Sequence, residues 1–147
     1  MCPIYWTNGL KMGHNAEELI KELFFENPSQ EFYLRQIARQ TSVPKTTTNS
    51  ILMRLLKENL VIRKKEEPFD KYVSNTENSI YKFYKKYAIL EKIYASGIID
   101  KIVDQAQPKV IILFGSCAKG EYNKKSDIDL FVQSEEIEIY QQMFNLK

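Results

Sequence analysis

Apolar side chains recur at helical spacing in the first part of the chain and predict three helices. The first spans residues 15–26, with Asn15 as a favourable N-cap, and the second spans residues 31–40. The third starts at Pro44, which suits a first helical turn, and runs to about Asn59. The side chains of the second and third helices that we expect to face a core are Leu34, Ile37, Ala38, Ile51, Leu52, Leu55 and Leu56.

A different pattern follows, because residues 60–73 read as two short strands around a charged loop that contains proline. The surrounding charge is uneven. Residues 31–75 hold nine Lys and Arg against five Asp and Glu, whereas the whole chain has a net charge of only +2. This local excess of positive charge favours a surface that binds a polyanion.

Three helices followed by a hairpin resemble the winged helix-turn-helix family over residues 15–75. The similarity rests on the Leu34–Ala38 segment, the turn after it, the leucine-rich third helix and Leu60–Arg63. It implies DNA as a partner, with the start of the third helix in the major groove. The implied DNA-binding residues are Arg35, Arg39, Lys45, Thr46, Thr47, Thr48, Asn49, Arg63, Lys64 and Lys65. The alternative is a protein–protein or dimerisation element whose charges are only solvated.

A connector helix is predicted over residues 78–106, interrupted by Gly97. Its apolar side chains repeat at alternating spacings of three and four, as in a coiled-coil seam. These side chains are Ile80, Phe83, Tyr87, Leu90 and Tyr94. We expect the seam to pack on the preceding helices or on a second copy of the chain, and a homodimer is favoured.

The chemistry-bearing stretch covers residues 110–132. A short apolar run predicts a buried strand that ends at Gly115-Ser116, and a second strand with Asp127 and Asp129 is its sheet partner. Alternate residues of a strand share a face, so the two carboxylates repel each other unless a cation lies between them. Hard oxygen ligands suit Mg²⁺ or Mn²⁺.

The segment between these strands has features of a phosphate-binding turn. Gly115 and Gly120 allow tight turns in which backbone N–H groups approach a phosphate, and Ser116 adds a hydroxyl donor. A phosphate site that faces metal-binding carboxylates is suited to phosphoryl or nucleotidyl transfer. The alternative is a β-hairpin with two solvated aspartates on its outer face.

The segments Gly115–Glu121 and Ser126–Leu130 resemble the polymerase-beta-like nucleotidyltransferases, and most closely their small prokaryotic members, bacterial or archaeal, called minimal nucleotidyltransferases. The resemblance implies nucleotide binding at Gly115, Ser116 and Gly120, with ATP the first NTP to consider, and Mg²⁺ held by the catalytic Asp127 and Asp129. A hydroxyl then attacks the α-phosphorus. In such relatives the acceptor is a tyrosine of a partner toxin of the HEPN type or a small molecule such as an aminoglycoside.

Two features depart from that family. Cys117 stands where many relatives have a basic residue, and the family's further carboxylate on a later strand has no counterpart. The chain ends eighteen positions after Asp129, and the only later carboxylates, Glu135, Glu136 and Glu138, fall where a strand should give way to a helix. We therefore expect either an incomplete domain or one that binds nucleotide and metal without efficient catalysis.

Composition is that of a soluble globular protein, with 44% hydrophobic and 27% charged residues among 147. No apolar run is long enough for a membrane span and the two cysteines lie in unlike contexts, so we expect a cytoplasmic protein without disulfides. The predicted fold class is α+β. It consists of an N-terminal extension (1–14), a winged helix (15–75), a connector (76–107) and a truncated nucleotidyltransferase α/β unit (108–147).

Two functions remain open at this point. The first is a DNA-docked nucleotidyltransferase that moves a nucleoside monophosphate from an NTP to a hydroxyl acceptor with Mg²⁺. The second is a transcriptional regulator whose nucleotidyltransferase-like domain is inactive and serves nucleotide sensing or assembly.

Overall fold

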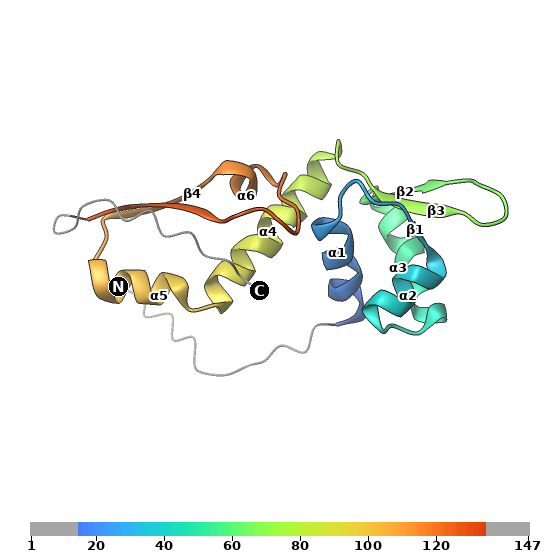
Figure 1. Cartoon of the computed structure of the whole chain (residues 1–147), viewed down its shortest axis with the longest axis horizontal. Coiled ribbons are helices and arrows are strands. Elements are labelled where there is room, and N and C mark those ends of the chain that lie inside the picture. Colours follow the sequence, from blue (N-terminus) through green and yellow to red (C-terminus); the bar gives the residue numbers. More distant parts are fainter. Residues whose placement is uncertain (1–14, 135–147) are drawn as a thin grey trace.

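A computed structural model describes residues 15–134, and in this range the chain is α+β, with six helices and two small antiparallel sheets. Figure 1 shows an elongated molecule in which helix α4 (Ser79–Ala95) joins two parts. We call residues 15–75 the N-terminal module. It contains α1 (Ala16–Glu26), β1 (Phe32–Tyr33), α2 (Leu34–Thr41), α3 (Lys45–Lys57), β2 (Val61–Lys64) and β3 (Lys71–Ser74).

Residues 97–134 form the second part, which we call the C-terminal unit. It contains α5 (Ile98–Ala106), β4 (Val110–Phe114), α6 (Gly115–Lys119) and β5 (Asp129–Gln133). The prediction of a helix after β5, over residues 135–146, and the N-terminal extension both lie outside the described residues.

Helix α1 begins where the sequence predicts. The side chain of Asn15 accepts hydrogen bonds from the backbone N–H groups of Glu17 and Glu18, both at 3.0 Å. The Glu18 carboxylate accepts one from the backbone N–H of Asn15 at 3.0 Å. This reciprocal capping box satisfies N–H groups that a helix start otherwise leaves unpaired.

The second predicted helix starts too early, because residues 32 and 33 form strand β1. Phe32 lies opposite Tyr72 of β3, and its side chain is buried. This short segment therefore pairs with the sheet and also contributes to the hydrophobic core. Helix α2 then begins at Leu34. The burial of Phe32 and its pairing with a residue forty positions later outweigh the helical pattern of the local sequence.

The three strands of the N-terminal module form a sheet in the order β1-β3-β2, which confirms the predicted β2–β3 hairpin. The helices pack on one another and on this sheet around a single core. Its fully buried members include Ile20 and Phe24 of α1, Ile37 of α2, and Leu52 and Leu55 of α3. The module therefore has a closed hydrophobic interior.

Helix α4 buries a different face from the one that its heptad pattern predicts. The side chains that face the interior are Tyr81, Lys85, Ile89 and Ile93. We call the five residues with heptad-like spacing the α4 seam; they are Ile80, Phe83, Tyr87, Leu90 and Tyr94. They are 40 to 66% exposed, so the seam does not pack on the N-terminal module. Both faces of this helix are apolar, and the elements that pack on α4 determine which face is buried.

The break at Gly97 is confirmed, and α5 starts directly after it. Strands β4 and β5 pair antiparallel, as predicted for sheet partners, with Leu113 opposite Leu130. These two residues pack with Ile98 and Ile99 of α5 against a small cluster of buried residues. The other face of the two strands stays exposed and carries Val110, Ile112, Phe114 and Phe131. The prediction of a strand before Gly115 is confirmed, but the prediction that this strand is buried is wrong, because in the described residues no element covers this face.

The two parts touch where the end of α1 meets α4 and the loop after α6. The Tyr81 hydroxyl donates to the backbone oxygen of Phe24 at 3.2 Å. Lys92 forms ion pairs with Glu22 and with Glu26, and the backbone N–H of Lys124 donates to the backbone oxygen of Glu26 at 3.0 Å. Polar contacts thus fix the position of the C-terminal unit relative to α1. Within residues 15–134, no helix is long and apolar enough to cross a membrane.

Candidate functional site

The pairing of β4 with β5 brings the predicted carboxylates to the glycine–serine turn. Phe114 is the last residue of β4 and lies opposite Asp129, the first residue of β5. Gly115 and Ser116 follow directly and open the short helix α6. The turn and Asp129 are therefore neighbours in space, although they are fourteen positions apart in the sequence.

Gly115 is required at this place for two physical reasons. Its φ of +69° lies in the left-handed region, which other residues adopt at a cost. A Cβ added to Gly115 would overlap a carboxylate oxygen of Asp129 and lie 3.2 Å from its Cγ. The Asp129 carboxylate thus rests against the bare backbone of the turn.

Asp127 and Asp129 flank a residue that faces the interior. Ile128 is buried, Asp127 is exposed and Asp129 is half-buried. In an extended segment this alternation directs the two carboxylates away from the core that holds Ile128. The sequence predicted this alternation, and it leaves both carboxylates accessible from solvent.

Cys117 connects the helix that follows the glycine–serine turn to the aspartate segment. Its thiol donates a hydrogen bond to the backbone oxygen of Asp127 at 3.3 Å, and its side chain is 1% exposed. Burial is the largest cause that raises the pKa of this thiol, and the nearby charges of Asp129 and Asp127 raise it further. Position 117 therefore faces the core, and its side chain fixes the start of α6 to the aspartate segment.

Gly120 is placed differently from the sequence prediction of a phosphate contact. It is buried against α4, and an added Cβ would lie 2.7 Å from the backbone oxygen of Lys82. Its backbone N–H donates to the carbonyl groups of Cys117 and Ser116 at the end of α6. Close helix packing explains this glycine, and its N–H group is already used, so Gly120 is not part of the group around Asp129.

The carboxylate pair can be compared with the needs of a divalent cation. In residues 15–134, no group of three or more His, Cys, Asp and Glu side chains could hold a metal ion. Mg²⁺ is commonly held by one or two carboxylates together with substrate phosphates and water. Asp127 and Asp129 fit that smaller donor set, while Glu135, Glu136 and Glu138 lie outside the described residues.

Tyr122 is a site-forming residue that the sequence did not indicate. Its ring is buried, and its hydroxyl donates to the backbone oxygen of Lys85 on α4 at 3.1 Å. Burial raises the pKa of Tyr122 above its usual range. This residue fastens the loop between α6 and Asp127 to α4. Its position among polar residues, Glu121 to Lys125, was the available signal, since a lone aromatic residue in a polar loop is often an anchor.

Nine of the ten predicted DNA-binding residues are exposed on the N-terminal module. The exception is Thr48, which is 0% exposed and donates its hydroxyl to the backbone oxygens of Pro44 and Val43. Because it is in the core beneath the start of α3, Thr48 cannot face a ligand, and its prediction is corrected.

The basic residues of this set differ in their ion pairs. Arg63 pairs with Asp70 at 3.5 Å and Lys64 with Glu31 at 2.5 Å, so acids already lie beside the basic side chains of β2. Lys64 and Lys71 lower the pKa of Glu31, chiefly through the hydrogen bond from Lys64. Arg35, Arg39 and Lys45 make no such pair within the described part of the chain.

Comparison with known families identifies one region of the chain. Residues 95–143 match the family model of the nucleotidyltransferase domain, and they include Gly115, Ser116, Asp127 and Asp129. The match covers about one third of the chain and begins at the last residue of α4. No curated protein and no solved structure matches the chain significantly. Residues 95–143 are therefore similar to the nucleotidyltransferase domain family.

Proposed function

We propose that residues 95–143 form a nucleotidyltransferase domain that binds an NTP, ATP first among them, and transfers its nucleoside monophosphate to a hydroxyl acceptor. The observation that supports this most directly is the position of the Asp129 carboxylate against the backbone of Gly115. Ser116 begins α6 at the same point, and Asp127 is two residues away on exposed chain. Phosphate-binding backbone and acidic side chains thus share one small region.

The proposed chemistry uses Asp127 and Asp129 as the ligands of Mg²⁺ or Mn²⁺. When bound, the ion would neutralise phosphate charge and polarise the α-phosphorus. The chain's own contribution is positional: buried Ile128 fixes the two carboxylates, and Gly115 leaves room for the Asp129 carboxylate beside the turn. The acceptor oxygen forms a bond to the α-phosphorus, the bond to the bridging oxygen breaks, and pyrophosphate leaves with that electron pair. The proton of the hydroxyl passes to water.

A paired substitution tests the site. In Asp127→Asn/Asp129→Asn, the side-chain shape is kept and two negative charges are lost, so Mg²⁺-dependent ATP binding should weaken by about a hundredfold or more. Titration calorimetry with a non-hydrolysable ATP analogue measures this. The matched control is Asp104→Asn on the exposed face of α5, which should leave the affinity unchanged. Equal affinity in the double variant and the wild type would contradict the site.

Transfer is tested separately with ATP that carries labelled α-phosphate. Label that appears on a protein or small molecule with a free hydroxyl supports the enzyme. The resemblance suggests two acceptors for the assay, a tyrosine on a HEPN-type toxin and an aminoglycoside. Loss of transfer in the double aspartate variant, with intact folding by circular dichroism, is the expected result.

We further propose that the N-terminal module is a winged helix that binds DNA. Its element order and its sheet, in which a two-residue strand before α2 joins the β2–β3 hairpin, support this reading. At the start of α3, Lys45, Thr46, Thr47 and Asn49 are exposed, which suits an element that reads base edges. Arg35 and Arg39 lie on the exposed side of α2, where phosphate contacts are expected.

The ion pairs of the N-terminal module show which candidate DNA-binding side chains must give up an acidic partner before they can bind a phosphate. Arg35, Arg39 and Lys45 can bind phosphate without breaking an ion pair, whereas Arg63 and Lys64 must first leave Asp70 and Glu31. We therefore infer a larger contribution from α2 and α3 than from the hairpin. Lys65 follows β2 in the exposed loop of the hairpin and makes no ion pair within residues 15–134.

Salt dependence measures the proposed DNA contacts without knowledge of the operator. For a mixed-sequence duplex, Arg35→Gln/Arg39→Gln should flatten the plot of log affinity against log salt by about two, since each phosphate contact contributes roughly 0.9 to the slope. Lys101→Gln on exposed α5 removes a positive charge elsewhere and should not change the slope. A slope that is the same in all three proteins would overturn the DNA proposal.

A second candidate function is a regulator with an inactive nucleotidyltransferase domain. It is favoured by the lack of any third acidic ligand beside Asp127 and Asp129 in residues 15–134. Under this proposal ATP changes DNA affinity, but no label is transferred. The transfer assay and the DNA titration, done with and without ATP, thus separate the two functions.

Self-association is the remaining part of the proposal. The α4 seam is exposed along the whole helix and keeps heptad-like spacing, which two copies related by a two-fold axis can use in the same way. Phe83→Ser/Tyr87→Ser should convert a dimer to a monomer in analytical ultracentrifugation. The control Ile112→Ser changes an exposed apolar residue of β4 and should leave the dimer intact. A wild-type protein that sediments as a monomer at high concentration contradicts the homodimer.

A further inference from the structure

Lys85 is a buried lysine in the middle of α4. Its side chain is 1% exposed, although lysine is almost never fully buried without a charged partner. Among the described residues it forms no ion pair and its ammonium donates no hydrogen bond. Two aromatic rings lie beside it, with Nζ 4.6 Å from the ring centre of Tyr122 and 5.7 Å from that of Tyr81. Ring faces attract a cation, but they do not replace its lost hydrogen bonds.

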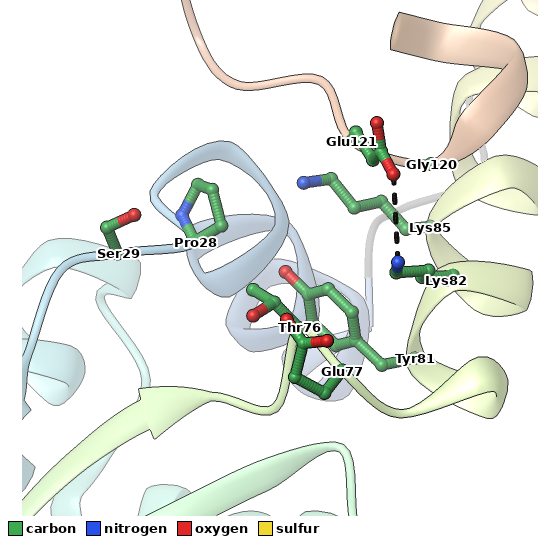
Figure 2. Close-up of a pocket in the computed structure, with 9 residues that line it drawn as sticks. All are labelled: Pro28, Ser29, Thr76, Glu77, Tyr81, Lys82, Lys85, Gly120 and Glu121. Carbon is green, nitrogen blue, oxygen red and sulfur yellow. Dashed lines mark ion pairs between the residues drawn. The ribbon is translucent and has the colours of Figure 1, made fainter.

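The ammonium of Lys85 points into a cavity, as Figure 2 shows. The cavity has a volume of about 250 Å³ and lies between the two parts of the molecule. One wall comes from the N-terminal module and the β3–α4 connection, with the hydroxyls of Ser29 and Thr76. The facing wall comes from α4 and from Gly120-Glu121, in the loop that follows α6.

Among the described residues, the Lys85 ammonium is the positively charged group of this cavity that has no carboxylate in an ion pair with it. Lys82 and Glu121 pair with each other across the rim at 3.7 Å, marked by the dashed line in Figure 2. Glu121 is an exposed rim residue, and its carboxylate is beyond ion-pairing distance of Lys85. Glu77 also lines the opening. The inner surface is therefore cationic and aromatic, while the rim carries both signs.

We propose that this cavity binds a small phosphate-bearing anion, with its phosphate on the Lys85 ammonium. A phosphate offers several acceptor oxygens at once, which suits a floor with an ammonium and a rim with a second one from Lys82. Ser29 and Thr76 supply hydroxyl donors on the opposite wall for the rest of the ligand. The cavity has room for inorganic phosphate or a small phosphomonoester.

This site is separate from the carboxylate site. It is built on the side of the α6–β5 loop that packs against α4, whereas Asp129 lies at Gly115 on the strand side. A ligand here would touch walls from both parts of the molecule and so stabilise their contact. Phosphate binding thus couples the N-terminal module to the loop that follows the glycine–serine turn.

The pKa of Lys85 leaves its amine charged near neutral pH, as binding of a phosphate requires. Burial lowers it from 10.5 to about 8, while the charges of Cys117 and Glu121 act in the opposite direction. Lys82, Glu77 and the phenols of Tyr81 and Tyr122 are the other titratable groups that line this cavity or face this ammonium. Near neutral pH the amine is still charged, so phosphate binding should be strongest there and weaken as the pH rises above 8.

Phosphate titration of the full chain tests the site. Protein with ¹³C-labelled lysines is titrated with sodium phosphate at pH 7, at constant ionic strength, while the side-chain Cε resonances are recorded. One resonance should shift in a saturable way. In Lys85→Met that resonance should be absent and the affinity, followed by the rise in thermal midpoint, should fall at least about tenfold, as expected for a lost charge-assisted hydrogen bond.

Matched variants and ligands keep the outcome clear. Lys101→Met removes an exposed lysine of α5 and should bind phosphate as the wild type does. A second run with glycerol 2-phosphate distinguishes a free phosphate ion from a phosphomonoester, and either result supports the site if Lys85→Met abolishes it. The proposal is wrong if Lys85→Met binds phosphate as tightly as the wild type, if no saturable shift occurs, or if acetate binds equally well. Far-ultraviolet circular dichroism and a cooperative thermal transition check that each variant is folded, independently of the proposed ATP site.

Discussion

The two parts of the molecule differ in how completely they enclose an interior. In the described residues, the core of the N-terminal module, with one residue from α4, joins thirteen buried side chains, whereas the cluster beneath β4 and β5 joins five. Two of those five, Ile89 and Ile93, belong to α4 rather than to the C-terminal unit. The N-terminal module therefore has its own core, while the C-terminal unit depends on α4 for its interior.

The same difference appears on the surface. One face of the β4–β5 pair exposes Ile112, Phe114 and Phe131, and Asp129 lies at the edge of this open face, opposite Phe114. A functional site needs access, and an open two-stranded sheet provides it at the expense of buried area. The contrast suggests that the N-terminal module supplies most of the folding stability and that the C-terminal unit supplies the accessible surface on which the candidate site lies.

The largest expected effect comes from a deletion in the closed core. Phe24→Ala removes a ring that is 1% exposed and stacks edge-on against Phe32 at 5.6 Å, so unfolding should become easier by about 3 to 5 kcal/mol. Chemical denaturation measures the loss, and hydrogen exchange should locate it in residues 16–74. Met53→Ala, at an exposed position of α3, should change stability by less than about 0.5 kcal/mol. Equal loss of protection in β4 and β5 would contradict the independence of the module's core.

A second prediction concerns the contact between the two parts. The pKa of Lys85 is lower in the folded chain, about 8 against 10.5, so the unfolded chain binds more protons between these pH values. The charged amine thus destabilises the fold fully below pH 8, and the penalty disappears as the pH rises to 10.5. At 1.36 kcal/mol per pH unit, this difference corresponds to roughly 3 kcal/mol at most.

Lys85→Met keeps the apolar stem and removes the charge. Without added phosphate it should be more stable than the wild type at pH 7, and the gap between the two proteins should close towards pH 10.5. Urea denaturation at a series of pH values measures that gap. Lys101→Met should have the same free energy of unfolding as the wild type at every pH. A difference between Lys85→Met and the wild type that does not change with pH would show that packing, and not charge, causes the difference.

The smallest expected effect on stability concerns two glycines with similar backbone conformations, which should differ in their effect on nucleotide binding. Gly97 and Gly115 have φ values of +71° and +69°, so alanine at either should cost about 1 to 2 kcal/mol. At Gly97 an added Cβ meets nothing within 4 Å, whereas at Gly115 it would displace the Asp129 carboxylate. Only Gly115→Ala should therefore abolish ATP–Mg²⁺ binding in calorimetry. Nucleotide binding that survives Gly115→Ala would separate Asp129 from the nucleotide site.

Local signals in the sequence were sufficient for much of the fold. Asn15 marked the start of α1, Gly97 marked the break after α4, and the apolar run before Gly115 marked β4, because each depends on neighbours a few residues away. The aspartate segment was also evident, since its alternation around Ile128 is a local property of an extended chain.

Other features required contacts between distant residues. Strand β1 exists because Phe32 pairs with Tyr72, and Thr48 is buried because the turn at Val43 folds under the start of α3. Gly120 looked like a phosphate-binding glycine, but its neighbour is the backbone of Lys82. None of these partners lies within the short window that a periodic pattern covers.

The sequence alone determined most of the segments that become helices and strands, and it marked the glycine–serine turn and the aspartates as the candidate site, because spacing and residue type express both. Only the tertiary structure decided which side of α4 faces inward, and with it that the α4 seam is exposed and that Lys85 is enclosed beside Tyr122. Both sides of that helix are apolar enough to be buried. The choice between them follows from the shape of α1 and of the loop after α6, which no pattern within α4 records.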